Sequence, residues 1–280
     1  HANIEMAVNS LKQGAFEFVE KPFDQTRLLN FIKRAVENLN LKNQNKEYEN
    51  KLFSSYKIVG DSKNILNIKD QIDKISITES RIIINGPSGS GKELIARSIH
   101  KKSKRKNKPF IILNGALLDS NKYELELFGE EKENGSISYG ALEKANKGTL
   151  LIDQVSEIPL DIQSKILRVL IDQKFKRLNG NNDINVDVRI ICSSSKDLKE
   201  EIKFGNFRED LFHRLNVFEI IVKPLNQRVS DIPLLIKYFS KKISEAYNIK
   251  DLQIDENDSY ILNHNWQGNV RELRNLIERI

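Results

Sequence analysis

A glycine-rich segment directly after an apolar run constrains this chain more than any other feature. The run is Ile82-Ile83-Ile84, and the segment is Gly86-Pro87-Ser88-Gly89-Ser90-Gly91-Lys92-Glu93. Glycines permit backbone angles that other residues avoid, so successive N–H groups can converge on phosphate oxygens. Lys92 adds a positive charge, and the helix expected to begin there adds its dipole. The pattern predicts a strand, a phosphate loop and a helix, and therefore a nucleoside triphosphate as ligand.

Two positions near this loop differ from the usual pattern. Glu93 stands where a serine or threonine normally reaches magnesium. Asp153, after the apolar run 150–152, is suited to hold Mg²⁺ through water at the carboxyl end of a strand. Gln154 follows where a glutamate commonly polarises the attacking water, and an amide cannot accept that proton. We therefore expect ATP hydrolysis to be slowed by about 10²–10⁴-fold, with Glu157 a weaker candidate for the base.

The composition is that of a globular protein. Hydrophobic residues make up 39% of the chain and charged residues 30%. No apolar stretch approaches the roughly twenty residues of a membrane span, and the first residues lack the pattern of a signal peptide. A single cysteine, Cys192, excludes an internal disulfide framework and favours a reducing cytoplasm. The net charge of +6 permits nucleic-acid binding without requiring it.

Apolar runs alternate with helical patterns through most of the chain. The runs lie at 82–84, 110–113, 150–152, 188–192 and 217–222. This alternation predicts an α/β fold with a mostly parallel sheet covered by helices. Three amphipathic helix candidates follow, at 229–247, 256–263 and 268–280. We expect an α/β core at 56–224 and a helical lid at 225–280.

The first part of the chain has a different pattern. Residues 4–13 and 24–40 predict helices on either side of a short strand at 16–19. Residues 41–55 are mostly polar and resemble a linker. We expect a separate small unit over 1–40, joined to the core by that linker.

Several separated motifs resemble the AAA+ domain of NtrC-type response regulators. They are the phosphate loop ending in Gly-Lys-Glu, Glu126-Leu-Phe-Gly129, Phe-Arg-Glu-Asp-Leu-Phe-His-Arg-Leu-Asn at 207–216, and Trp-Gln-Gly-Asn-Val-Arg-Glu-Leu-Arg-Asn at 266–275. Residues 1–40 resemble the last part of a CheY-like receiver domain, with Gly-Ala-Phe-Glu-Phe-Val-Glu-Lys-Pro-Phe at 14–23 as the signature. The resemblance implies a AAA+ P-loop NTPase with a three-layer core and a helical lid. A receiver fragment and a linker helix would precede it.

The resemblance implies catalytic roles for four residues. Asn114 matches the polar residue that restrains the catalytic glutamate, and its partner here is Gln154. Arg208 and Arg214 match arginines that reach the nucleotide of a neighbouring subunit. A planar, permanently charged guanidinium suits that role. These matches imply a AAA+ ring or a dimer.

The resemblance also implies contacts to the nucleotide outside the phosphate loop. Ser194 and Ser195 match the position that senses the γ-phosphate, although the family often has Thr-Asn there. Arg271 matches a lid arginine that contacts the phosphates. The adenine pocket is matched by Ile58, Val59, Gly60 and Ile232. ATP and Mg²⁺ are the cofactors that these matches imply.

The segment between Gly129 and Gly140 departs from the family. Activators that remodel sigma-54 polymerase carry Gly-Ala-Phe-Thr-Gly-Ala there, whereas this chain has Glu-Glu-Lys-Glu-Asn-Gly-Ser-Ile-Ser-Tyr at 130–139. Loss of that loop resembles the NtrX branch, which implies a AAA+ domain that does not drive sigma-54 promoter opening. Ile137 or Tyr139 offers an exposed contact, although anchoring a helix start is the favoured interpretation.

Together these features predict a two-component transcription regulator that binds ATP, self-assembles and hydrolyses ATP slowly. The resemblance implies a cognate sensor histidine kinase and promoter DNA as partners, with RNA polymerase as a further one, and no membrane. The phosphoacceptor aspartate would lie before His1, and the helix-turn-helix after Ile280. Two alternatives stay open. One is a sigma-54-dependent activator ATPase, and the other is an assembly module whose pocket retains nucleotide only structurally.

Overall fold

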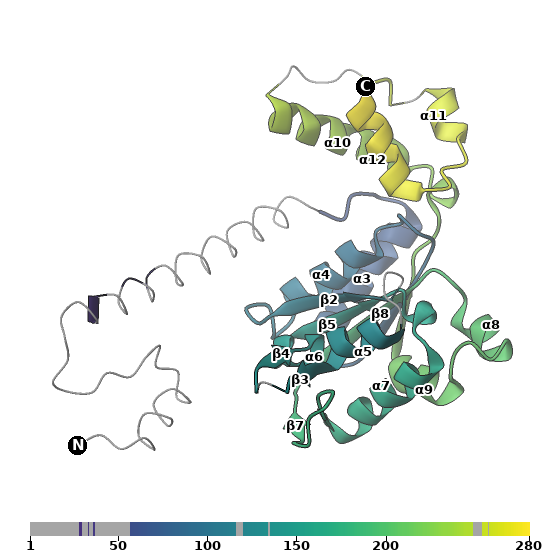
Figure 1. The fold of residues 1–280 in the computed structure, drawn as a ribbon. Helices are drawn as coiled ribbons and strands as arrows, with labels where there is room; N and C mark the ends of the chain where they lie inside the picture. The colour runs from purple at the N-terminus through teal and green to yellow at the C-terminus, as the bar shows by residue number, and fades with distance from the viewer. Residues whose placement is uncertain are drawn as a thin grey trace. The chain divides into compact units, whose positions relative to one another are not determined.

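The computed structural model describes residues 57–115, 120–133, 135–248, 254–256 and 258–280, together with four helical residues between 28 and 36. The chain divides into two units, residues 1–57 and residues 58–280, and the second of these is the one described below (Figure 1). Apart from those four residues, which fall within the helix predicted at 24–40, the predictions for the receiver-like segment and the linker lie outside the described residues.

A five-stranded parallel sheet forms the centre of the larger unit (Figure 1). The strand order is β2-β5-β8-β1-β9. The strands are β1 (Ile82–Asn85), β2 (Phe110–Asn114), β5 (Thr149–Asp153), β8 (Arg189–Ser194) and β9 (Phe218–Ile221). Each overlaps one of the predicted apolar runs, so the prediction of a parallel α/β sheet is confirmed.

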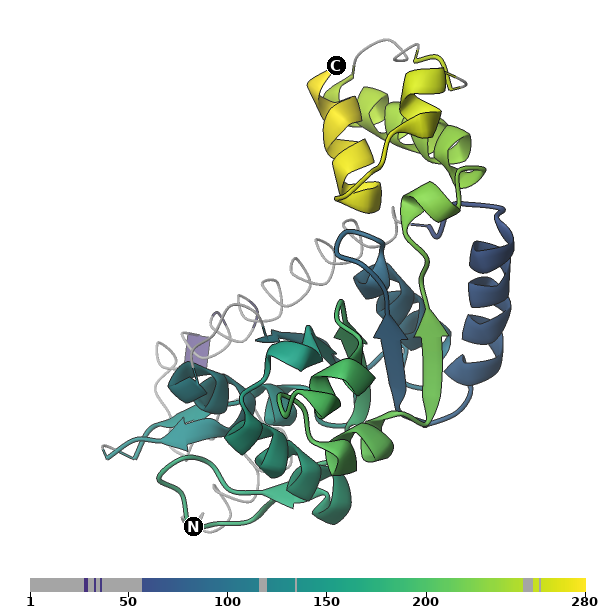
Figure 2. The ribbon, with the colours of Figure 1, turned by 90° about the vertical axis from the view of Figure 1, so that its right-hand side faces the viewer.

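Alternate residues of the strands supply two separate cores. Ile83, Ile152 and Cys192 pack on one face of the sheet, and Ile82, Leu151 and Ile191 pack on the other. This is the period-two alternation of a strand that is buried on both sides. Figure 2 shows helices on both faces of the sheet, which gives the three-layer core that the resemblance implies.

Different helices cover the two faces. Helices α3 (Lys63–Ser76) and α4 (Lys92–Lys102) contribute to one core. In α3 the isoleucines recur every three or four residues, so they form one apolar stripe. The other core is packed by α5 (Ser120–Phe128), α6 (Ala141–Lys144), α7 (Leu160–Asp172), α8 (Leu198–Lys203) and α9 (Glu209–Leu215).

The C-terminal segment folds into helices with a core of their own. After the 3-10 helix η3 (Leu225–Gln227) come α10 (Asp231–Tyr247), α11 (Ser259–Asn263) and α12 (Asn269–Arg279). Trp266 is a member of this third core, and its Nε1 donates to the carbonyl of Ile261 at 3.0 Å. The three helices predicted for the lid are confirmed.

The segment at 130–139 folds differently from the prediction. Its residues belong to an antiparallel hairpin of β3 (Gly129–Glu131) and β4 (Ile137–Tyr139). The favoured interpretation of Ile137 and Tyr139 as anchors of a helix start was wrong, because both side chains are exposed on β4. A run of charged residues and one glycine conceals these short strands in the sequence.

The structure also describes the environment of the cysteine and the character of the helices. Cys192 is fully buried in β8, and burial raises the pKa of its thiol to about 12, which leaves it unreactive. Among the residues that the structure describes, none of the helices combines the length and apolar character that a bilayer span requires.

Candidate nucleotide-binding site

The phosphate loop joins β1 to α4, as the sequence predicts. The N–H of Gly86 donates to the carbonyl of Ser194 at 3.1 Å, which fixes the start of the loop against β8. Gly91 has φ +105° and forms the N-cap of α4. A residue with a side chain would be strained at that angle. The loop thus turns tightly into the N-terminus of α4, where helix N–H groups and the helix dipole favour an anion.

Lys92 is almost completely buried inside this loop, at 5% exposure. Its Nζ donates to the carbonyls of Gly86 at 2.6 Å and Pro87 at 3.1 Å. Burial lowers its pKa, Asp153 opposes this effect, and Arg271 adds to it. The ammonium group therefore donates to carbonyl oxygens, with the carboxylate of Asp153 as a favourable charge nearby, and a polyphosphate would add further negative charge.

The loop has further features that fit a phosphate chain. The Ser90 hydroxyl is buried without a hydrogen-bond partner among the described residues. Buried polar groups normally have partners, so an unpartnered donor in this loop fits an anionic ligand. Gly89 has φ +75°, and a Cβ there would lie 2.1 Å from the carbonyl oxygen of Gly268. Only glycine lets the phosphate loop and the lid approach this closely.

Asp153 and Gln154 lie at the carboxyl end of β5, next to the end of β8. The Ser193 hydroxyl donates to Asp153 Oδ1 and also accepts from the Gln154 backbone N–H at 3.2 Å. Gln154 Oε1 accepts from the Ser195 hydroxyl at 2.7 Å and from the Ser195 N–H at 3.3 Å. Because a backbone N–H only donates, these bonds fix which end of the Gln154 amide faces Ser195.

Three further predicted residues, Asn114, Ser194 and Glu157, belong to strands or to a 3-10 helix near this edge of the sheet. Asn114 at the end of β2 lies in register with Asp153. The hydroxyl of Ser194 is turned away from Gln154 and donates to the carbonyl of Lys196 at 2.8 Å. Glu157 lies in the 3-10 helix η2 (Val155–Glu157), where its Oε1 is 3.0 Å from the ammonium of Lys196. Glu157, the weaker candidate for the catalytic base, is therefore already engaged in an ion pair.

The residues present fit magnesium in the manner of a phosphate-bound ion. Mg²⁺ commonly takes one or two carboxylates together with waters and substrate phosphates. Asp153 is placed to supply one such carboxylate. Glu93 accepts from Arg97 Nε at 2.8 Å, so its carboxylate is already paired. Within the described ranges no three His, Cys, Asp or Glu side chains gather into a preformed metal site.

The start of α12 contacts the phosphate loop directly. Asn269 Nδ2 donates to the carbonyl of Ser88 at 2.9 Å, and Asn269 Oδ1 accepts from the N–H of Leu225 at 2.8 Å. The N–H of Arg271 donates to the carbonyl of Gly89 at 3.3 Å. Asn269 is buried at φ +55°, an angle that asparagine adopts more readily than most residues. These bonds place Arg271 beside the phosphate loop.

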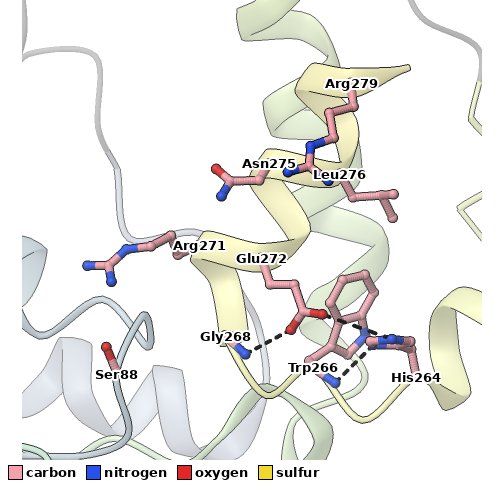
Figure 3. A pocket seen from close by; sticks show the side chains of 9 residues that line it. All are labelled: Ser88, His264, Trp266, Gly268, Arg271, Glu272, Asn275, Leu276 and Arg279. Atoms are coloured by element: carbon pink, nitrogen blue, oxygen red, sulfur yellow. Dashed lines mark hydrogen bonds and ion pairs between the residues drawn. The ribbon is translucent and has the colours of Figure 1, made fainter.

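A pocket of about 430 Å³ opens beside this contact (Figure 3). Ser88 of the phosphate loop and Arg271 line it together with residues at the N-terminal side and along the length of α12. Glu272 Oε2 accepts from the N–H of Gly268 at 2.8 Å, which caps the start of α12. Arg271 therefore extends from a helix end that is held by its own cap and by the phosphate loop.

Arg208 and Arg214 lie on the surface around α9. Arg208 is the N-cap residue of α9, and its guanidinium pairs with Asp210, with Nη2 at 2.7 Å from Oδ2. Arg214 is exposed in the last turn of that helix. An exposed pair of this kind is weak, so both guanidinium groups are accessible to another molecule.

The predicted adenine-pocket residues come together from two segments. Ile58, Val59 and Gly60 precede α3, and Ile232 is fully buried in the first turn of α10. Ile58 packs against the core of α3 and α4, whereas Val59 packs against the core of the lid. This short segment, 58–62, is named the base-side loop below.

The β3–β4 hairpin is held against the segment that follows strand β6 (Lys174–Phe175). Arg177 Nη1 lies 2.8 Å from Glu131 Oε1, and Arg177 Nη2 lies 2.6 Å from Glu143 Oε2. The guanidinium also lies 5.5 Å from the centre of the Tyr139 ring. Backbone hydrogen bonds between Leu178 and the hairpin add to these contacts. Arg177 thus contacts Glu131 and Tyr139 of the hairpin and, at the same time, Glu143 of α6.

Sequence reasoning missed four residues of this site. They are Ser193, Asn269, Arg228 and Asp231. The first three contact a predicted site residue or the phosphate loop, and Asp231 accepts from the backbone N–H groups of Asp61 and Ser62, next to the predicted adenine-pocket residues. Ser193 could have been found as a hydroxyl at the carboxyl end of an apolar strand. Asn269 lies within the motif at 266–275, but its left-handed backbone is not evident from the sequence. Arg228 and Asp231 have the appearance of an ordinary pair at a helix start.

Comparisons with known proteins agree with this architecture. Residues 58–221 match the family model described as the sigma-54 interaction domain, and residues 226–280 match the AAA+ ATPase lid domain. The nitrogen assimilation regulatory protein NtrX of Azorhizobium caulinodans is 44% identical over 282 residues, which cover 100% of this chain and 62% of that protein. The chain therefore spans about three fifths of this relative.

Solved structures give the same result. A crystal structure of NtrX from Brucella abortus is similar to the chain with a TM-score of 0.79 and 43% identity, covering 100% of this chain and 63% of that one. The same protein in complex with ATP gives a TM-score of 0.78 at 43% identity, covering 100% of this chain and 64% of that one. The chain therefore belongs to the sigma-54 interaction domain family, and its C-terminal segment is a AAA+ lid domain.

Proposed function

We propose that this chain is the central part of a two-component transcription regulator whose AAA+ domain binds ATP with Mg²⁺ and uses the bound nucleotide to control its assembly. The observation that carries the proposal is the phosphate loop itself. It combines a buried Lys92 held only by carbonyls with an unpartnered Ser90 hydroxyl, as counted within the described residues. The Brucella relative in complex with ATP supports the same ligand.

Slow hydrolysis is part of this proposal. Gln154 holds the position of the expected base, and its acceptor oxygen is engaged by Ser195. An amide in that position can orient water but cannot take its proton. Glu157, the weaker candidate, is paired with Lys196. We therefore assign the nucleotide a signalling role, with Asp153 as the carboxylate that faces Mg²⁺ and Asn114, Ser194 and Ser195 nearby.

The proposal places the boundary between core and lid near residue 225. The match to the sigma-54 interaction domain ends at residue 221 and the match to the lid domain begins at residue 226, which supports a boundary between them. Residues 1–40 would be the end of a receiver domain and 41–55 a linker. A cognate sensor histidine kinase and promoter DNA would be partners of the full-length protein in the cytoplasm. Assembly would bring Arg208 and Arg214 to a neighbouring nucleotide.

A sigma-54 activator ATPase is the second candidate, because the matched family is the sigma-54 interaction domain. Gln154 and the β3–β4 hairpin both argue against a sigma-54 activator ATPase. That hairpin lacks the Gly-Ala-Phe-Thr-Gly-Ala loop and is clamped by Arg177. Binding of the sigma factor together with stimulated phosphate release would favour this second function over the first.

Nucleotide-dependent assembly is the first expected result. Sedimentation velocity should show a larger species with ATP and Mg²⁺ than without nucleotide, since the exposed Arg208 and Arg214 would complete a neighbouring site only when it contains phosphate. Arg208→Ala should reduce the change in size without changing the fold measured by circular dichroism. A size that is the same with and without ATP would favour the assembly module whose nucleotide is only structural.

A further inference from the structure

A buried ion pair joins the lid to both loops of the nucleotide-binding site. The exposed fractions are 4% for Arg228 and 0% for Asp231. Arg228 Nη1 lies 3.6 Å from Asp231 Oδ2. Arg228 directly follows η3, and Asp231 is the first residue of α10. Burial of two charges is costly unless hydrogen bonds satisfy their remaining donors and acceptors, so the other contacts of this pair are informative.

Asp231 holds the base-side loop. Its Oδ1 accepts from the backbone N–H groups of Asp61 and Ser62, both at 2.8 Å, and its Oδ2 accepts from the Ser62 hydroxyl at 2.8 Å. Gly60 lies against the same carboxylate at φ +139°, and a Cβ there would be 2.6 Å from Asp231 Oδ1. The close approach therefore requires glycine at position 60. Asp231 thus fixes the conformation of the segment that contains Ile58, Val59 and Gly60.

Arg228 holds the phosphate loop. Its Nη2 donates to the carbonyl of Ser90 at 3.1 Å, two residues before Lys92. Its Nε donates to the carbonyl of Lys223 at 3.1 Å, in the segment that leads into the lid. The planar guanidinium thus contacts the phosphate loop, the entry to the lid and Asp231 at the same time, which an ammonium group cannot do with the same geometry.

We propose that the Arg228–Asp231 pair sets the position of the base-side loop relative to the phosphate loop, and so determines how much the adenine base adds to the affinity for ATP. The inference rests on the proposed function, namely that ATP binds at this site, with its base beside residues 58–60 as the resemblance implies. Arg228 and Asp231 are positioning residues, since they act through the Ser90 carbonyl and the backbone of residues 61 and 62. Their arrangement fixes two segments of the proposed nucleotide site relative to each other.

The proposal separates two contributions to binding. Phosphate binding depends on the backbone of the glycine-rich loop and on Lys92, and the pair reaches this loop through one hydrogen bond, from Arg228 to the Ser90 carbonyl. The contribution of the base depends on whether residues 58–60 are in place when the phosphates are bound. Breaking the pair should therefore weaken ATP binding while it leaves binding of a phosphate chain without a base nearly unchanged.

The test compares Asp231→Asn and Arg228→Lys with the unaltered chain, using calorimetry with ATP and with inorganic tripolyphosphate. Asparagine keeps an acceptor for the two N–H groups but removes the charge that Arg228 pairs with. Lysine keeps the positive charge but lacks the several N–H donors in one plane with which Arg228 reaches its three partners. Each variant should bind ATP about tenfold more weakly, whereas tripolyphosphate affinity should stay within about threefold. The matched controls Asp70→Asn and Arg274→Lys alter exposed ion pairs and should leave both affinities unchanged.

Several results would overturn the proposal. A pair that is merely structural would change the melting temperature while the ratio of the two affinities stays constant. If the unaltered chain binds tripolyphosphate as tightly as ATP, the base adds nothing and the positioning role fails, although phosphate binding stands. If it binds neither, the proposed function itself fails. Should both variants fail to fold, Ser62→Ala removes one bond to Asp231, together with the N-cap bond to Ile65, and should lower the ratio of ATP affinity to tripolyphosphate affinity about threefold. An unchanged ratio in that variant contradicts the proposal.

Discussion

Replacing Lys92 with methionine should reduce the affinity for ATP by about a hundredfold or more, because the phosphates lose a buried charge-assisted contact. The same change should leave the nucleotide-free fold at least as stable as before. Lys92 carries its charge at 5% exposure among carbonyls, and burial is the main cause of its lowered pKa. Calorimetry with ATP and thermal unfolding without nucleotide measure the two effects on the same sample.

The pKa shift adds a pH signature to this prediction. The pKa of Lys92 is lower in the folded chain than its ordinary value of 10.5, so the unfolded chain binds more protons in the window just below 10.5. The free energy of unfolding should therefore rise with pH in that window, and this contribution should be absent in Lys92→Met. Lys74→Met changes an exposed lysine that is paired with Asp70 and serves as the control. Loss of stability in Lys92→Met without loss of ATP affinity would contradict the assignment.

Replacing Gln154 with glutamate should raise the rate of phosphate release at least about tenfold, because a carboxylate can accept the proton of the attacking water. The structure accommodates the change. The groups that contact Gln154 Oε1 are the hydroxyl and the backbone N–H of Ser195, and both can donate to a carboxylate oxygen. The second carboxylate oxygen would then be the base. Steady-state phosphate release at saturating ATP measures the effect.

Two further variants make the result interpretable. Gln154→Met has a similar size but no proton acceptor, so it should show no rise. Glu157→Gln removes the carboxylate paired with Lys196 and should leave the slow rate of the unaltered chain unchanged. If Gln154→Glu shows no rise, then the Glu93–Arg97 pair or the serines at 193–195 also limit catalysis.

Much of the core was predictable because its signals are local. Each of the five apolar runs in the sequence overlaps one strand of the sheet. Helical periodicity located the three helices of the lid. The phosphate loop is recognised from consecutive residues, since its geometry depends on glycines at fixed positions. Asp153 was expected at the carboxyl edge of the sheet, where ligands of α/β proteins gather, and Asn114 and Ser194, which the resemblance implied, lie at strand ends of the same edge.

The parts that were not predicted depend on contacts between distant segments. The β3–β4 hairpin is held by Arg177, more than thirty residues from either carboxylate that it pairs with. Asp231 meets the base-side loop across 170 positions of sequence. Ser193 rather than Ser194 contacts Asp153, because alternate residues of β8 face opposite sides. Neither composition nor periodicity carries information about such pairings.

We propose that this AAA+ domain binds ATP but turns it over slowly. The decisive measurement pairs the affinity for ATP with steady-state phosphate release, on one sample and across a series of protein concentrations. We expect tight binding and negligible release at every concentration. Release that climbs cooperatively with protein concentration would mean that Arg208 and Arg214 complete an active neighbouring site, and it would contradict the role assigned to Gln154.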